Sequence, residues 1–149
     1  MKRIFLLFAS AAIIWSCQNQ AQDKQADVAD ADQYANAMTD TANFTTIQWL
    51  DSARDMGKIK EGEKVEIAFR FRNAGNKPLI IKNVTPSCGC TVADFPKQPL
   101  KPGEEGVIKG VFDSNGRPGV NNKIMTVSAN TTGVQNHTIS FMVDVQKKD

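Results

Sequence analysis

The chain has 149 residues, 41% of them hydrophobic, and a formal net charge of +2. Two of its basic residues, Lys2 and Arg3, precede an apolar stretch typical of an export signal, and without them 16 basic and 16 acidic side chains remain. A neutral chain with no cluster of Lys and Arg excludes a nucleic-acid-binding protein, because binding to phosphates requires such a cluster. The length predicts a single domain.

The first 17 residues predict a lipoprotein export signal. An apolar run covers residues 4–15, interrupted only by Ser10, and is too short for a membrane-spanning helix of about 20 residues. The segment ends in Ile13-Ile14-Trp15-Ser16-Cys17, which resembles the bacterial lipobox, although Trp15 is bulkier than usual. In such signals a peptidase cuts before the cysteine, whose thiol then carries diacylglycerol. Residues 1–16 are therefore predicted to be the signal peptide and Cys17 the lipid attachment site; the alternative is an ordinary signal peptide with a chance cysteine.

Residues 17–42 are predicted to be the lipidated cysteine and a flexible tether. From residue 18 onward the composition is rich in Ala, Gln, Asp, Asn and Thr, with few large apolar side chains. Such a segment cannot bury enough apolar surface to fold alone. A flexible coil of this length has a reach of about 25–30 Å, which would hold the domain close to a membrane. No acidic cluster follows Cys17, and we expect the anchor in the inner leaflet of a bacterial outer membrane, facing the periplasm.

From residue 43 onward the pattern is that of short β-strands. Val65, Ile67, Phe69 and Phe71 alternate with polar or small residues, which indicates a half-buried strand. Similar runs are separated by turn residues and lie at 43–50, 55–59, 79–84, 107–112, 123–129 and 138–145. About seven short strands without an amphipathic helix predict that residues 43–149 form an all-β domain, an immunoglobulin-like antiparallel β-sandwich.

Several stretches in this order resemble one bacterial family. They are Asp55-Met56-Gly57-Lys58-Ile59, Glu61-Gly62-Glu63, Phe71-Arg72-Asn73-Ala74-Gly75, Pro78-Leu79-Ile80-Ile81, Ser87-Cys88-Gly89-Cys90-Thr91, Pro102-Gly103-Glu104 and the turn from Asp113 through Gly119. The chain is similar to the bacterial domain-of-unknown-function family numbered 1573, which has Hydin-type and major-sperm-protein-type immunoglobulin-like folds. The resemblance implies an envelope protein of a Bacteroidota-type bacterium. Bacteria of this group O-glycosylate Asp-Ser/Thr-apolar motifs, which resemble the stretches at Thr41 and Ser52, but such short motifs often occur by chance.

The pair Cys88 and Cys90 is the most distinctive feature of the domain. If Cys17 carries lipid, these two cysteines remain as a pair in an oxidising compartment, where disulfides form. Residues two apart on a regular strand have α-carbons roughly 6.5–7 Å apart, which is the outer limit for a disulfide. A bridge therefore requires the backbone to bend at Gly89. It would close a very small loop and be easily reduced.

Three interpretations of this pair stay open. It is a structural feature of the fold, reduced and packed or locally bridged; it is a thiol-redox site, although no Cys-X-X-Cys motif is present; or it binds a soft ion such as Cu(I) or Zn(II). A closed zinc site usually takes four protein ligands, and the further candidates here are His137, Met56, Met125 and Met142. We expect His137 to be an ordinary surface or edge residue and the methionines to lie in the core.

No catalytic motif accompanies the cysteine pair. The single histidine limits acid–base chemistry, and the sequence has neither a Gly-rich phosphate loop nor a metalloprotease motif. We therefore expect a protein that is not an enzyme and has no resident cofactor. Its expected function is that of a lipid-anchored binding or assembly module, which contacts another envelope protein by edge-strand pairing. The alternative is a periplasmic metal-binding or thiol-redox protein that acts through Cys88 and Cys90.

Overall fold

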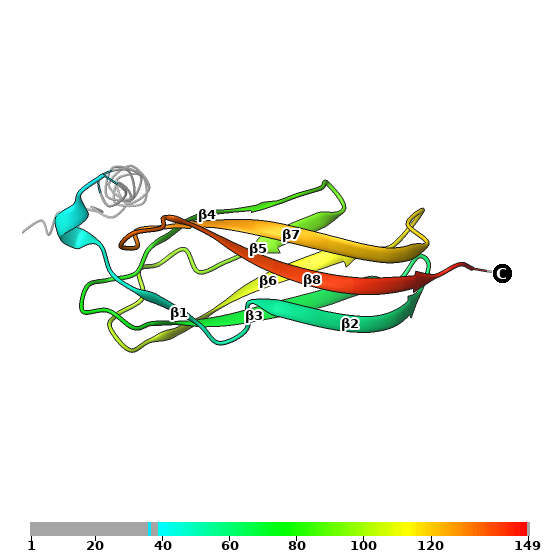
Figure 1. The fold of residues 1–149 in the computed structure, drawn as a ribbon, viewed down its shortest axis with the longest axis horizontal. Helices are drawn as coiled ribbons and strands as arrows, with labels where there is room; N and C mark the ends of the chain where they lie inside the picture. Colours follow the sequence, from blue (N-terminus) through cyan, green and yellow to red (C-terminus); the bar gives the residue numbers. More distant parts are fainter. Residues whose placement is uncertain (1–35, 37–38, 149) are drawn as a thin grey trace, which may run out of the picture.

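The computed structural model describes residue 36 and residues 39–148. Two four-stranded sheets pack face to face in an elongated sandwich (Figure 1). The predicted signal peptide, Cys17 and most of the predicted tether lie outside the described residues. The elements are η1 (Thr41–Asn43), β1 (Ile47–Trp49), β2 (Ala53–Lys60), β3 (Lys64–Asn73), β4 (Ile81–Pro86), β5 (Thr91–Asp94), β6 (Glu105–Asp113), β7 (Gly119–Ala129) and β8 (Asn136–Gln146).

The predicted all-β sandwich is confirmed, with eight strands where about seven were expected. The additional strand is β5, which follows the cysteine pair. One sheet has the order β1-β3-β6-β5 and the other β2-β8-β7-β4. All pairings are antiparallel except that between β2 and β8, which is parallel. This exception arises because the chain changes sheets at the bend between β1 and β2, so that β2 runs along β8 instead of continuing beside β3.

The core lies between the sheets and follows the alternation of the sequence. In β3 the side chains of Ile67, Phe69 and Phe71 are buried, whereas their neighbours point to solvent. Phe112 of β6 and Phe141 of β8 belong to different sheets, and their rings meet edge to face with centroids 5.6 Å apart. This is a favoured geometry for aromatic pairs and ties the two sheets together at the centre of the core.

Two buried asparagines close one end of the sandwich. Asn73 Oδ1 accepts hydrogen bonds from Thr45 Oγ1 (2.9 Å) and the Gly75 amide (3.1 Å), and its Nδ2 donates to the carbonyls of Lys77 (2.7 Å) and Leu100 (3.0 Å). Asn130 acts in the same way: Oδ1 accepts from the Ile80 amide, and Nδ2 donates to two other carbonyls. Among the described side chains no buried polar atom lacks a partner, so these amides replace the ladder bonds that the turns cannot make.

No helix in residues 36 and 39–148 is long and apolar enough to cross a membrane. η1 and the end of β8 lie at opposite ends of the long axis of the sandwich (Figure 1).

Candidate functional site: the Cys88–Cys90 bridge and an uncharged sheet face

Cys88 and Cys90 form a disulfide in the connection between β4 and β5. These strands belong to different sheets, so the bridge lies at a crossover from one layer of the sandwich to the other. The bend that a bridge requires is present, because residues 87–90 form a turn that the Thr91 amide closes onto the Cys88 carbonyl (3.3 Å). This turn shortens the distance between the two α-carbons to 5.3 Å, within the usual range for a disulfide.

The two cysteines differ in their exposure to solvent. Cys90 is 6% exposed and belongs to the hydrophobic core, whereas Cys88 is half-buried and packs against the core from outside. Between them Gly89 is exposed, and a β-carbon at that position would meet no atom within 4 Å. The hydroxyl of Thr91 lies 3.9 Å from Cys88 Sγ and 4.0 Å from Cys90 Sγ. The bridge is therefore open on the Cys88 side and closed on the Cys90 side.

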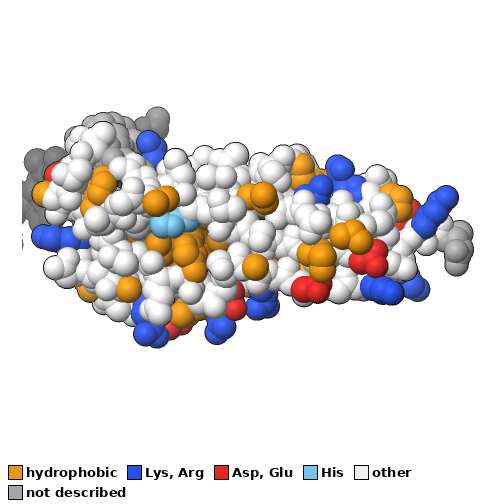
Figure 2. Space-filling view, viewed as in Figure 1, with side chains coloured by type: hydrophobic (Ala, Val, Ile, Leu, Met, Phe, Trp, Pro, Cys, Tyr) orange, Lys and Arg blue, Asp and Glu red, His pale blue; other side chains and the backbone are white. Residues whose placement is uncertain are grey.

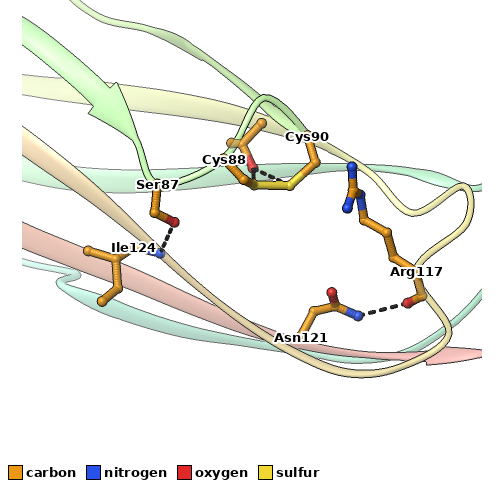
Figure 3. Close-up of a disulfide and its surroundings, with 7 residues drawn as sticks. Ser87, Cys88, Cys90, Arg117, Asn121 and Ile124 are labelled. Carbon is orange, nitrogen blue, oxygen red and sulfur yellow. Dashed lines mark hydrogen bonds between the residues drawn. A yellow bond between two sulfur atoms is a disulfide. The ribbon is translucent and has the colours of Figure 1, made fainter.

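Hydrogen bonds hold both flanks of the turn without help from the disulfide. The Ser87 amide donates to the Ile124 carbonyl (2.9 Å), and Ser87 Oγ accepts from the Ile124 amide (3.3 Å; Figure 3). On the other side the Asp113 amide donates to the Cys90 carbonyl (2.9 Å). A bridge that closes a three-residue loop restricts the unfolded chain by only about 1.6 kcal/mol in the chain-entropy model. The disulfide is thus a minor contributor to stability.

A basic side chain faces the bridge from the loop between β6 and β7. In Figure 3 the Arg117 side chain extends from this loop toward Cys90. Asn121 fixes the loop, since its Nδ2 donates to the carbonyls of Arg117 (2.8 Å) and Gly119 (2.9 Å). A guanidinium in this position favours the thiolate over the thiol form of a nearby cysteine.

The other candidate ligands do not join the cysteines in a cluster. Within the part of the chain that the structure describes, no three His, Cys, Asp or Glu side chains gather in a group that could hold a metal ion. Met125 is fully buried and Met56 packs against the core, as expected, but Met142 is exposed on the outer face of its sheet, contrary to expectation. In the bridged state neither sulfur is a thiolate, so a two-thiolate metal site would form only after reduction.

His137 is the second residue of β8, and it is not the ordinary surface residue that we expected. Its ring is half-buried, 5.9 Å from the ring of Trp49, and its Nε2 lies 2.8 Å from Thr131 Oγ1. The Thr131 hydroxyl donates its proton to the Val134 carbonyl, so the imidazole Nε2–H donates to Thr131. Burial lowers the pKa of His137 below 6.5, while a hydrogen bond to the Val134 backbone opposes this shift.

The outer faces of the two sheets differ in charge. On the β1-β3-β6-β5 sheet, the outward positions of β3 and β6 carry Lys64, Glu66, Arg70, Arg72, Glu105 and Lys109. On the other sheet, Asp144 of β8, Lys82 of β4 and Asp55 and Lys58 of β2 are charged. Beside them lies a block of ten outward positions in β4, β7 and β8 without charge: Asn83, Thr85, Asn122, Ile124, Thr126, Ser128, Asn136, Thr138, Ser140 and Met142. We call these ten residues the uncharged face. Figure 2 views this side, where white side chains predominate and charged ones lie mostly toward the margins.

A shallow hollow lies where the uncharged face meets β2. Ile124 is 47% exposed and Met142 39% exposed, and both line this depression of about 520 Å³ between β2, β7 and β8. Its lining also includes the charged residues Arg54, Asp55 and Lys123. Sequence reasoning missed Ile124 and Met142 as parts of a surface. The signal was present, because alternate positions of residues 122–128 and 136–142 lack charge, but it emerges only when the register places the two strands side by side.

The free edges of both sheets are poorly suited to strand addition. β1 has three residues and β5 has four, and Pro96 follows β5 closely. β4 ends at Pro86, which has no amide proton, and contains a register shift. β2 has a bulge at Gly57 (φ 67°) and several exposed charged residues. Short, bulged, charged or proline-containing edges are the features by which sheets avoid pairing with other strands, so the expected edge-strand pairing finds little support in the geometry.

A protein-family model matches most of the β-sandwich. The family model described as "Protein of unknown function (DUF1573)" matches residues 47–145. The chain belongs to the DUF1573 family. The DUF1573 match includes the disulfide, the uncharged face and the Asn73 turn. No curated protein matches the chain in sequence.

Solved structures are similar to this DUF1573 chain in fold. A protein of unknown function from Porphyromonas gingivalis W83 has a TM-score of 0.60 and 19% identity, covering 70% of this chain and 48% of its own. The VesB protease of Vibrio cholerae has a TM-score of 0.55 and 16% identity, with coverages of 84% and 40%. PapD-like domain 7 of human CEP192 has a TM-score of 0.50 and 11% identity, with coverages of 95% and 98%. The chain spans less than half the length of the first two, and at these identities the likeness concerns the PapD-like, immunoglobulin-like sandwich alone.

Proposed function

We propose that this DUF1573 protein is a non-catalytic binding module of the bacterial cell envelope, held at a membrane by lipid on Cys17. Its partner is another envelope protein that presents an uncharged surface with exposed aliphatic side chains. The module contacts this partner through the uncharged face instead of a strand edge. The lipid anchor follows from the lipobox-like end of the export signal, and the inner leaflet of an outer membrane is the proposed location.

The observation that carries the proposal is the contrast between the two outer sheet faces. A solvated sheet face normally carries charged side chains, as the outer face of β3 and β6 does. Interfaces are depleted of charge at their centre, because a charge without a partner is costly to desolvate. The uncharged face combines ten neutral positions with two exposed apolar side chains, Ile124 and Met142, in a hollow that Arg54, Asp55 and Lys123 border. A neutral centre with charged residues around it suits a protein partner that presents apolar side chains at its own centre.

The uncharged face has the area of the centre of an interface. Strands lie about 4.8 Å apart and rise about 3.4 Å per residue, so three strands over seven residues (122–128 in β7 and 136–142 in β8) cover roughly 340 Å². A standard protein interface buries about 800 Å² on each partner. The uncharged face would therefore supply the centre of the contact, and the charged residues around it the rim.

Site-specific photo-crosslinking in cells tests this proposal. A photoreactive residue at Ile124 should give one defined adduct with an envelope protein, whereas the same residue at Val107 should not. Val107 is the matched control, because it is an exposed apolar strand residue (37%) on the charged face. Met142→Lys places a charge in the hollow and should abolish the Ile124 adduct. Equal adducts from both positions, or an adduct that survives Met142→Lys, would refute docking at this face.

The anchor has its own test. Labelled palmitate should be incorporated into the wild-type protein and not into Cys17→Ser. Label on the serine variant would contradict lipidation at this position.

A further inference from the structure

We propose that the Cys88–Cys90 bridge is a thiol–disulfide exchange site for a protein dithiol, with Cys88 Sγ as the sulfur that is attacked. This activity is separate from the docking function of the uncharged face. Arg117 is a positioning residue that favours departure of the Cys90 thiolate.

The open side of the turn provides the access that an attacking thiolate needs. Thiolates attack a disulfide sulfur from the side opposite the departing sulfur, so the target must be approachable. Cys88 is half-buried and the adjacent Gly89 lies in open space, whereas Cys90 is 6% exposed and enclosed by the core. An incoming protein therefore reaches Cys88 and leaves Cys90 as the departing sulfur.

The surroundings stabilise the departing thiolate. A thiolate released into apolar surroundings would be a poor leaving group, because burial disfavours its charge. Thr91 Oγ1, 4.0 Å from Cys90 Sγ, supplies a hydroxyl, and Arg117 extends toward Cys90 with a positive charge (Figure 3). Cationic groups of this kind lower the pKa of a cysteine and speed its departure.

The fold tolerates the opened bridge. The turn stays connected on one side through Ser87 and Ile124 and on the other through Cys90 and Asp113, by backbone and hydroxyl hydrogen bonds that do not involve sulfur. Reduction therefore changes the thiols without separating β4 or β5 from its sheet. A disulfide with a purely structural role would instead be expected to close a long loop or to be fully enclosed.

The exchange takes two steps, in which the bonds, protons and electrons balance. A thiolate of the partner dithiol attacks Cys88 Sγ, the bond between the two sulfurs breaks, and Cys90 leaves as a thiolate that takes up a proton. The second partner thiolate then attacks the partner sulfur of the mixed disulfide, and Cys88 leaves as a thiolate that is also protonated. Two electrons pass from the partner, which becomes a disulfide, to the bridge, which becomes two thiols.

Reduction of the purified full-length chain tests the inference, with dithiothreitol as the probe dithiol. Free thiols are alkylated at successive times and counted by mass spectrometry, while circular dichroism follows the fold. We expect reduction in the absence of denaturant with the β-sheet spectrum retained. A bridge that opens only after unfolding, or two thiols that never oxidise to a bridge, would overturn the proposal.

The position of attack and the role of Arg117 have separate readouts. The monothiol glutathione should form its mixed disulfide at Cys88; an adduct at Cys90 contradicts the assigned direction. Arg117→Gln should slow reduction about threefold at low salt and lose this difference at high salt. The control is Lys77→Gln, which removes an exposed cation before the start of β4, at the opposite end of that strand from the turn. An unchanged rate for Arg117→Gln, or an equal effect of Lys77→Gln, would remove Arg117 from the site.

Discussion

Replacing Asn73 should destabilise the sandwich more than any nearby surface change. Asn73→Ala removes four hydrogen bonds from a side chain that is fully buried. The Leu100 carbonyl keeps its bond from the Leu79 amide (2.8 Å), but the buried Thr45 hydroxyl loses its acceptor. The Lys77 carbonyl and the Gly75 amide also lose a partner, although both lie where water has partial access.

The magnitude follows from these losses. A buried polar group left without a partner costs about 1–3 kcal/mol, and a bond that water partly replaces costs nearer 0.5–1 kcal/mol. One buried hydroxyl and two partly buried backbone groups together give about 3–4 kcal/mol. For a domain with an unfolding free energy of about 5–15 kcal/mol this is a large share, and it corresponds to a fall in Tm of more than about 10 °C.

Urea unfolding followed by circular dichroism measures this loss. Asn76→Ala is the matched control, because Asn76 is an exposed asparagine in the same turn, and it should change stability by less than about 0.5 kcal/mol. Asn73→Asp preserves the volume but cannot donate to two carbonyls, so it should be as damaging as alanine at neutral pH. A cost below about 1 kcal/mol for Asn73→Ala, or wild-type stability of Asn73→Asp, would refute the hydrogen-bond account.

Three further predictions use the same unfolding assay. Gly75→Ala should lower the free energy of unfolding by more than about 2 kcal/mol, because the new β-carbon would lie 2.1 Å from the hydroxyl oxygen of Thr45. Gly57→Ala should lower it by about 1–2 kcal/mol, because its β-carbon meets no atom but the backbone has φ 67°. Equal effects of the two variants would contradict the close approach at Gly75. Reduction of the Cys88–Cys90 bridge should lower the free energy of unfolding by only about 1.6 kcal/mol, and unfolding of the reduced protein would show that the bridge is essential to the fold. Burial lowers the pKa of His137, so its contribution to stability is fully present above pH 6.5 and should be lost as the pH falls from 6.5 through the lowered pKa. His137→Gln should flatten this pH dependence of the free energy of unfolding. An unchanged slope in the variant would assign the dependence to another group.

The alternation of apolar residues was enough to predict the strands of the core. Residues 65–71 and 138–145 carry large apolar side chains at every second position, and both fall within strands, β3 and β8, whose inward side chains are buried. Alternation fixes which face of a strand is buried, but it says nothing about the neighbour of that strand. The parallel pairing of β2 with β8 depends on the bend between β1 and β2, where the chain changes sheets, and no local pattern encodes that change.

The cysteine pair shows a similar limit. The requirement for a bend was predicted from the spacing of Cys88 and Cys90, and the turn supplies it. The sequence did not show that this turn crosses from one sheet to the other, because strands β4 and β5 are adjacent in the chain but belong to different layers. The approach of Arg117 depends on the β6–β7 loop, about 27 residues further along the chain, which only the tertiary structure brings to the bridge.

The bridge and the uncharged face are adjacent, because Ser87 contacts Ile124. A substitution at Ile124 can therefore test the two proposals separately. Ser87 precedes Cys88 and bonds to the backbone of Ile124, whose side chain lines the hollow of the face. A protein docked on this face would therefore lie next to the more accessible sulfur. Ile124→Gln removes the apolar side chain without adding a charge near the sulfurs, and it leaves both backbone bonds to Ser87 available. It should abolish docking while dithiothreitol still reduces the bridge at the wild-type rate, because a small dithiol needs no docking surface. A large change in that rate would mean that the face shapes the thiol site itself, and the two functions would then be one.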